Sequence, residues 1–364
     1  MSNHRHRLRG LLVEAGIAAA GGMMIVAVFA PRIAAAGWLV AFVFWSQIPI
    51  GSLMLMMIHR LTGGRWGEAL YPALSPAARL VPLLFLLIVP VFIAIPLLDP
   101  WSHRAGDVKP DVLSYYLNTP FFIARSLIAI AGWSVLAFLL PRTTGRPGQL
   151  VAAVGLVFHC VVISVVAVDW VLSLEPPFIS SSFGASMAIT QLIAALAWAA
   201  LRAPQAADGQ VTGDVGGLLL AFVLGITYVN FMAFLVMWYG DLPSRVFWFV
   251  ERDAWVPLAA AAFVFGSAVP ILALLLARVR NGIRQLRAVA ISVLAGLACY
   301  YAYLIVPPFG VRALGAAALA VIVIGLIVAA LAGRAISAPS LPSPAPLPNP
   351  PQQAGEGRVG EGGG

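Results

Sequence analysis

Long apolar runs separated by short polar connections are the dominant pattern of this chain. Ten runs have about the ~20 residues that a helix needs to cross the hydrocarbon core of a bilayer. They lie near residues 10–30, 37–59, 79–98, 120–140, 150–174, 183–201, 214–239, 254–277, 286–306 and 311–333. The pattern predicts an all-α polytopic membrane protein with one transmembrane domain, residues 1–334.

The composition excludes an ordinary soluble domain. Hydrophobic residues make up 61% of the chain and charged residues 10%, whereas charged residues make up about 25% of a typical soluble domain. The net charge is +8, but the 22 basic residues are spread through the connections, without a block that indicates nucleic-acid binding. Seven prolines fall between Pro339 and Pro351, so we expect residues 335–364 to form a disordered, Pro/Gly-rich cytoplasmic tail.

The distribution of basic residues orients the chain. Outside the runs, fifteen Lys and Arg residues lie on the side of the two termini and six on the other side. Basic connections stay on the cytoplasmic side, so both termini are expected in the cytoplasm. Aromatic residues that anchor at interfaces cluster at the outer ends of the runs; they are Trp101, Tyr115, Tyr116, Trp238, Tyr239, Phe247, Trp248 and Trp255.

The N-terminal run has two interpretations. Basic residues precede it and three alanines, residues 34–36, follow it, as in a cleavable signal peptide. We prefer a retained helix, because the run from Leu11 to Ala30 is close to spanning length and carries Glu14.

Two acids end the fifth run, in the stretch from Asp169 to Pro176. An ionisable side chain inside a bilayer costs at least ~2.5 kcal/mol, so it usually faces a bundle interior, finds a partner or relays protons. Arg125 lies a turn and a half inside the fourth run, where a cation opposes the helix dipole and an acid is expected nearby. We therefore predict an ion pair between Arg125 and Asp169.

Glu175 differs from Asp169 in its position. Six residues separate the two acids, which means about 9 Å of helical rise and nearly opposite faces, so they do not share a proton directly. Pro176 restricts the backbone of Glu175 and places this acid at the water boundary. Two interpretations stay open: a clamp of Arg125 with one acid that only fixes helix packing, and a functional site.

Other polar candidates lie deeper or nearer the cytoplasm. His159 lies close to midplane in the fifth run, while Gln47 and Pro49 lie near the middle of the second run and His59 at its cytoplasmic end. A neutral imidazole with one hydrogen bond is one interpretation of His159, and a proton relay is the other. Pro49 frees backbone carbonyl groups, which accompanies polar pathways but also simple kinks.

A bound haem, cluster or metal is not expected. Two axial ligands must reach one iron from opposite sides, whereas His59 and His159 differ in depth by about 13 Å. Cys160 and Cys299 are isolated within apolar runs, so they are expected to be small buried hydrophobic residues.

The outer connections at 99–119 and 240–253 are the longest. In the second one, Asp241 and Pro243 are start signals for a short helix lying along the interface. A docking surface and a plain interfacial anchor are equally compatible with it.

Four segments together resemble a known family. They read IHRLTGGRWG at 58–67, YLNTPFF at 116–122 followed by Arg125, DWVLSLEP at 169–176 followed by Phe183 and Gly184, and MWYGDLP at 237–243 followed by Arg252. In this order they resemble the ActF subunit of alternative complex III. That subunit is an NrfD-like (PsrC-like) membrane subunit of a bacterial quinol:cytochrome c oxidoreductase.

The resemblance implies two four-helix bundles with peripheral helices, in a bacterial inner membrane. It implies quinone or quinol, either menaquinone or ubiquinone, as substrate, and no haem or iron–sulfur cluster in this chain. The implied partners are a second NrfD-like subunit of the ActC type, an iron–sulfur protein, c-type cytochromes and, as a further possible partner, a terminal oxidase. The resemblance places Asp169 in the outer half of a polar path, His159 in its middle and His59 near its cytoplasmic mouth. We therefore expect Asp169, Arg125 and Glu175 to form an outer quinone or proton site, and His159, His59 and Gln47 to lie along a proton path.

Two rival functions remain. The first is a structural anchor that assembles soluble redox subunits without a substrate site of its own. The second is a secondary transporter, for which matched broken helices at midplane would be the sign. The sequence offers only Pro49 as such an interruption.

Overall fold

A computed structural model describes residues 2–102, 110–176, 178, 180–203, 209–240 and 243–337. The side chains described within these ranges begin at Glu14 and end at Leu331. Helices build all of the regular structure there, and these ranges contain no strand. All but the first three residues of the tail expected at 335–364, and the helix-start residue Asp241, lie outside the described residues.

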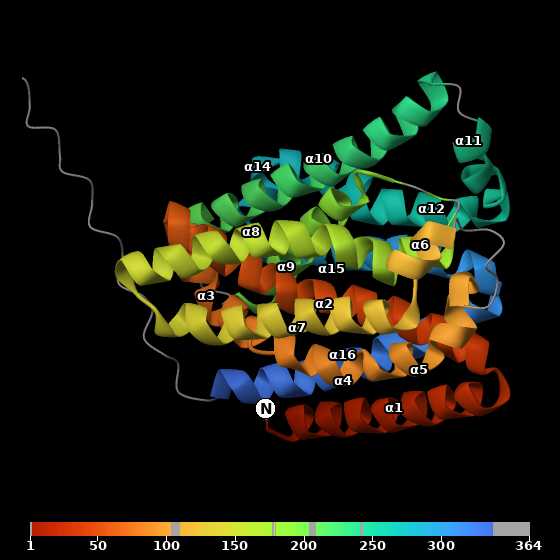
Figure 1. The fold of residues 1–364 in the computed structure, drawn as a ribbon. Coiled ribbons are helices and arrows are strands. Elements are labelled where there is room, and N and C mark those ends of the chain that lie inside the picture. Colours follow the sequence, from red (N-terminus) through yellow and green to blue (C-terminus); the bar gives the residue numbers. More distant parts are fainter. Residues whose placement is uncertain are drawn as a thin grey trace, which may run out of the picture.

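The helices alternate in direction along the bundle (Figure 1). The long ones are α1 (Ser2–Phe29), α2 (Pro31–Thr62), α7 (Thr119–Leu139), α8 (Gly145–Trp170), α9 (Phe183–Arg202), α10 (Gly209–Tyr239), α15 (Ile283–Ile305) and α16 (Arg312–Ser337). The shorter ones are α3 (Arg65–Ala78), α4 (Leu84–Leu87), α5 (Val89–Leu98), α6 (Pro110–Tyr115), α11 (Pro243–Val250), α12 (Val256–Phe263), α13 (Val269–Leu275) and α14 (Ala277–Arg280).

The described residues contain nine helical segments that are long and apolar enough to cross a bilayer. They are Pro31–Thr62, Arg65–Leu87, Thr119–Arg142, Gly145–Leu174, Phe183–Arg202, Gly209–Tyr239, Asp253–Leu275, Ile283–Ile305 and Arg312–Leu331. The chain is therefore an all-helical, multi-pass membrane protein, as the apolar pattern predicts.

One of the ten expected spans differs from the structure. The first expected span, near 10–30, falls on α1, Ser2–Phe29, of which Glu14–Phe29 is the described apolar part. The span expected at 79–98 is divided between the end of Arg65–Leu87 and the shorter apolar helix Val89–Leu98. Proline explains the division, because a proline inside a helix removes a backbone hydrogen bond and clashes with the preceding turn.

Residues 60–79, expected as a cytoplasmic connection, contain the amphipathic helix α3. Leu70, Ala73, Leu74 and Ala77 are buried and recur at the spacing of one helical face. Gly63 and Gly64, both at positive φ, make the turn between α2 and α3. The connection is therefore part of the packed bundle.

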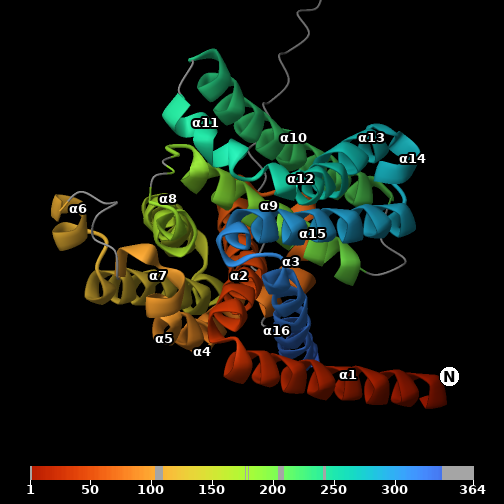
Figure 2. The ribbon, with the colours of Figure 1, turned by 90° about the vertical axis from the view of Figure 1, so that its right-hand side faces the viewer.

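Helix α2 lies at the centre of the molecule (Figure 2). It packs against α16, α9, α3, α8 and α5, and nearly all of its side chains from Leu39 to Met57 are buried. Helices α7 and α8 lie on one side of α2, and α10, α12 and α15 lie on the other. The N-terminal helix α1 lies on the outside, against α16 and α2.

The start of α1 and the end of α16 lie at the same end of the bundle (Figure 1). Helices α6 and α11 lie at the opposite end, called the α11 end below. The short helix expected after Pro243 is present as α11. The sites described next are built mainly at the α11 end.

Candidate functional site

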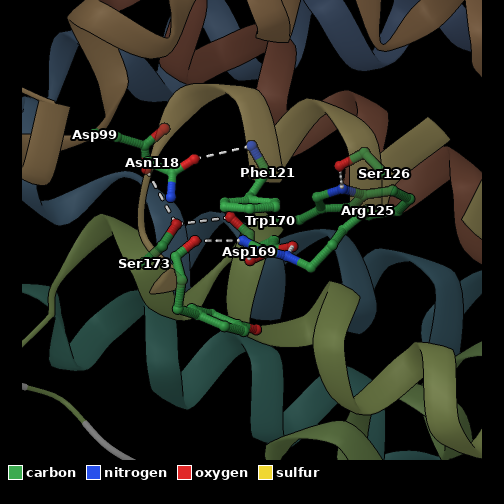
Figure 3. Close-up of polar contacts among 9 residues, drawn as sticks. Asp99, Asn118, Phe121, Arg125, Ser126, Asp169, Trp170 and Ser173 are labelled. Carbon is green, nitrogen blue, oxygen red and sulfur yellow. Dashed lines mark hydrogen bonds and ion pairs between the residues drawn. The ribbon is translucent and has the colours of Figure 1, made fainter. Parts of the chain in front are cut away.

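A buried ion pair joins α7 to α8 near the α11 end (Figure 3). Arg125 Nε donates a hydrogen bond to Asp169 Oδ2 over 2.7 Å, and Arg125 Nη2 donates to Asp169 Oδ1 over 2.8 Å. The Asp169 side chain is fully buried, while 18% of the Arg125 side chain is exposed. Two parallel charge-assisted bonds hold both groups in one orientation. The ion pair predicted from the sequence is therefore present.

The start of α7 positions the arginine. Asn118 Oδ1 accepts a hydrogen bond from the Phe121 backbone N–H over 3.0 Å and caps the helix. Arg125 Nη2 also donates to the Tyr116 carbonyl oxygen over 2.9 Å, and its guanidinium lies 4.0 Å from the centroid of the Tyr116 ring. Burial, together with the nearby Asp169 carboxylate, raises the pKa of Tyr116 to about 12. The phenol therefore stays protonated at neutral pH.

A second acid, Asp99, lies beside this pair, and the sequence pattern does not single it out. Asp99 follows the last residue of α5 and is 4% exposed. Its Oδ1 lies 3.1 Å from Ser173 Oγ, which in turn lies 2.7 Å from the backbone carbonyl oxygen of Asp169. Burial raises the pKa of Asp99 to about 7, and the Asp169 carboxylate acts in the same direction.

The Ser173 hydroxyl explains how Asp99 is accommodated. A serine hydroxyl has one hydrogen to donate and two lone pairs that accept. The Asp169 carbonyl oxygen can only accept, so Ser173 donates to it across the shorter distance of 2.7 Å. The 3.1 Å contact with Asp99 then becomes a hydrogen bond when the Asp99 carboxyl itself carries a proton. The geometry thus favours protonated Asp99.

A second contact between α7 and α8 lies one residue further along each helix. Trp170 Nε1 donates to Ser126 Oγ over 3.0 Å (Figure 3). The Trp170 ring packs edge-on against Phe42, with the two centroids 4.8 Å apart. Little water reaches such surroundings, so the electrostatic attraction within the pair is stronger than at a protein surface.

Glu175 belongs to a separate cluster. Its Oε2 accepts hydrogen bonds from Arg252 Nη2 and, over 2.7 Å, from Trp248 Nε1. The Arg252 guanidinium lies 3.7 Å from the Trp248 ring centroid, and the other stacking partner of Trp248 is Phe178, with centroids 4.2 Å apart. The side chain of Arg252 is 2% exposed and that of Glu175 is 26% exposed. The single outer site expected from the sequence is therefore divided into two ion pairs.

A cavity of about 800 Å³ lies beside the Glu175–Arg252 pair, between α9, α10, α11, α12 and α15. Trp248 and Phe178 form part of its wall. Most of the lining is apolar, but hydroxyl and amide groups also reach it, among them Ser182, Ser186, Thr190, Asn230, Ser267 and Tyr300. Sequence reasoning missed this cavity because its walls come from helices up to about a hundred residues apart.

Gln47 is fully buried and lies next to the cavity wall. Its Nε2 donates to the Val43 carbonyl oxygen over 2.8 Å, and its Oε1 accepts from Thr190 Oγ1 over 3.2 Å. Thr190 Oγ1 also lies 2.7 Å from the Tyr301 hydroxyl. Gln47 thus ends a short chain of polar groups that begins at the cavity.

The two candidate histidines lie apart from this chain. His159 is 1% exposed, its ring lies 5.8 Å from the Trp133 ring, and neither ring nitrogen has a hydrogen-bond partner among the described residues. His59 Nε2 lies 2.9 Å from the Gly64 carbonyl oxygen, in the turn at the end of α2. Within the described ranges no direct hydrogen bond links His159, His59 and Gln47 into a path.

The comparisons with known proteins add no assignment. No protein-family model matches the chain, and no curated protein matches it. Among the described residues, no group of three or more His, Cys, Asp or Glu side chains is arranged to hold a metal ion. The chemistry that the described site offers is that of buried carboxyls, hydroxyls and guanidinium groups beside an apolar cavity.

Proposed function

We propose that this chain is an integral membrane subunit of a respiratory quinol:cytochrome c oxidoreductase of the alternative complex III type, in a bacterial inner membrane. It contributes a quinone-associated site, a proton path or both, while partner subunits carry the electrons. The partners are a second NrfD-like subunit, an iron–sulfur protein and c-type cytochromes, with a terminal oxidase as a further member of the assembly.

One observation carries this proposal: three of the four segments that bear the family resemblance meet in space at the α11 end. Segment 116–125 supplies Arg125, segment 169–176 supplies Asp169 and Glu175, and segment 237–252 ends at Arg252. These segments form two ion pairs. Sequence likeness that converges on charged groups inside a membrane domain supports a shared site, because such groups are costly there and usually functional.

The proposal also adopts the finer expectations drawn from the resemblance. In this proposal α2, α4–α5, α7 and α8 form one four-helix bundle, and α9, α10, α12–α13 and α15 form the other, with α1 and α16 peripheral. The end with the two termini faces the cytoplasm, because more basic residues lie on that side. The α11 end then faces the partner cytochromes.

The test is an Asp169→Asn variant, expressed with its native partners and purified in mild detergent. We expect subunits and haems to be retained while quinol-dependent cytochrome c reduction falls at least about tenfold, because proton transfer by a positioned group contributes at least that much. Asp111→Asn, which removes an exposed acid on α6 at the same end, is the matched control and should leave turnover unchanged.

The structural-anchor function predicts a different result. The bidentate Arg125–Asp169 pair is also a suitable helix clamp, so an anchor would lose yield or complex stability in Asp169→Asn while the assembled fraction turns over normally. Recovery of the wild-type chain without cytochromes or an iron–sulfur protein would contradict the proposed function.

A further inference from the structure

The cavity at the α11 end has the size of a small-molecule site. Its volume is about 800 Å³, within the range of about 300–1,000 Å³ that ligand pockets occupy. Helices α9, α10, α12 and α15 supply its walls, so it extends from the α11 end into the membrane-spanning part of the bundle. A ligand that reaches it can therefore come from the lipid phase.

The described lining carries no Asp, Glu, Lys, Arg or His side chain. A phosphate or carboxylate head group would have no counter-charge on this wall, and burying an unpaired charge costs several kcal/mol. The nearest charged cluster, Glu175 with Arg252, is neutralised within itself. The lining therefore selects a ligand without net charge.

Hydroxyl groups from several helices give this lining a second property. Ser182 immediately precedes α9, Ser186 and Thr190 belong to α9, Ser267 lies between α12 and α13, and Tyr300 belongs to α15. A hydroxyl can donate or accept a hydrogen bond. Such a wall can therefore bind a ring carbonyl and also the ring hydroxyl that results when that carbonyl is reduced.

The wall near Ser267 is also irregular in its backbone. Residues Val264–Ala268 form a π-helical turn between α12 and α13, and Gly266 and Ser267 in this turn line the cavity. A Cβ on Gly296 would lie 2.1 Å from the Gly266 backbone nitrogen, so only glycine permits this close approach of α15. π-helical turns inside α-helices frequently occur at functional sites.

Aromatic side chains complete the cavity near Glu175. Trp248 and Phe178 are stacked and both line the wall, and Trp248 is held by its hydrogen bond to Glu175. Because Phe178 and Arg252 cover the Trp248 ring, a flat ligand ring would pack against the edges of these aromatic side chains, an arrangement that aromatic pairs favour. We propose that this cavity binds the ring and the first part of the tail of a prenylated quinone or quinol, which rests on the proposed function and locates its ligand.

The experiment uses the full chain in lipid nanodiscs and decylubiquinone as the probe, with binding followed by quenching of Trp fluorescence. Ala233→Trp fills the cavity with an indole, because Ala233 lies in its wall on α10. Leu224→Trp places the same indole on an exposed position of α10 outside the lining and is the matched control. We expect saturable binding, a Kd raised at least about tenfold in Ala233→Trp, and an unchanged Kd in Leu224→Trp.

Ser267→Ala is the second variant, because it removes a hydroxyl without adding volume. It should weaken binding of both decylubiquinone and its reduced quinol form. Cholesterol and oleate added as competitors should not displace the probe; displacement by either one would show a general lipid site and would overturn the quinone assignment. Binding that does not saturate, or a Kd that is unchanged in both Ala233→Trp and Ser267→Ala, would overturn the proposal as well.

The cavity as the quinone site and the respiratory function of the chain can be tested separately. Asp169 does not line the cavity, so Asp169→Asn should bind decylubiquinone with the wild-type Kd. Normal quinol turnover in Ala233→Trp would refute the cavity as the quinone site while leaving the respiratory function intact. Saturable binding in a chain that assembles with no redox partner would support the cavity and refute the function.

Discussion

The two ion pairs at the α11 end are built in opposite ways. In the Arg125–Asp169 pair the acid is fully buried and 18% of the cation side chain is exposed. In the Glu175–Arg252 pair the cation is the buried member, at 2% exposure, and 26% of the acid side chain is exposed. Only six residues of sequence separate the two acids, yet each has its own arginine.

The difference determines which side chain of each pair needs its partner. A buried charge that loses its partner is left unpaired at low dielectric, whereas an exposed charge is rehydrated by water. Asp169 therefore depends on Arg125, and Arg252 depends on Glu175. A buried acid can also escape by taking up a proton, which an arginine does not do, because its guanidinium stays charged.

The largest expected effect is that of Arg125→Met, which leaves Asp169 buried without a cation. Breaking a buried pair in this way costs about 3–5 kcal/mol. SDS-induced unfolding in mixed micelles should show this loss of unfolding free energy. The double variant Arg125→Met/Asp169→Asn should recover much of it, because the stranded charge is gone.

The recovery in the double variant is the decisive control. If the double variant is as unstable as Arg125→Met alone, the loss comes from the missing arginine side chain and its contact with Tyr116. The claim that buried Asp169 depends on the charge of Arg125 would then be wrong.

A smaller loss is expected for Glu175→Gln. Glutamine keeps an oxygen for the Trp248 indole but removes the charge that neutralises Arg252. A hydrogen bond to a charged group contributes about 1.5–3 kcal/mol. The glutamine oxygen can still accept a hydrogen bond from buried Arg252, so the loss should stay at about 2 kcal/mol, below the cost of a fully unpaired buried charge. The same SDS titration measures it.

The reverse substitution sharpens the contrast. Arg252→Met removes the buried member and leaves the partly exposed Glu175, which water can solvate. It should destabilise the protein less than Glu175→Gln does. A larger loss in Arg252→Met would mean that packing of the arginine on Trp248 outweighs the electrostatic contribution.

Most of the fold follows from the apolar pattern, because a spanning helix needs a long run of apolar residues wherever it packs. The exceptions have local causes. Pro82 and Pro90 lie at the starts of the short helical segments into which the third expected span is divided. Residues 65–78 look like a loop because they begin with an arginine and contain Pro72 and Pro76, although the spacing of Leu70 and Leu74 already indicates a helix face.

The site is only partly predictable for a similar reason. Arg125 and Asp169 lie at matching depths on consecutive antiparallel helices, so depth alone brings them together. Arg252 reaches Glu175 only through the position of α11, and no local pattern specifies that position. Asp99 has the sequence context of a loop acid just after a helix, and only the packing of Ser173 against it reveals that it is buried.

Asp99 makes the stability of the folded protein depend on pH. Burial raises the Asp99 pKa to about 7 from an ordinary value near 3.8. A raised carboxyl pKa means that the folded state holds a proton that the unfolded state has released. Its contribution to stability is therefore fully present below about pH 4 and is lost as pH rises through 7. Between pH 6 and pH 8 the loss is about 1 kcal/mol.

Asp99→Asn tests this smallest effect, because the asparagine amide donates to Ser173 as the protonated acid does. The variant should already be more stable than the wild type at pH 6, because unfolded Asp99 is ionised there, and its advantage should grow by about 1 kcal/mol at pH 8, in SDS titrations at each pH. Glu175→Gln, in the other ion pair, serves as the control. It should leave unchanged the fall in unfolding free energy between pH 6 and pH 8 that Asp99 causes. If the unfolding free energy depends on pH equally in the wild type and in Asp99→Asn, Asp99 is already ionised at pH 6. The Asp99 carboxyl would then not carry the proton that its contact with Ser173 favours.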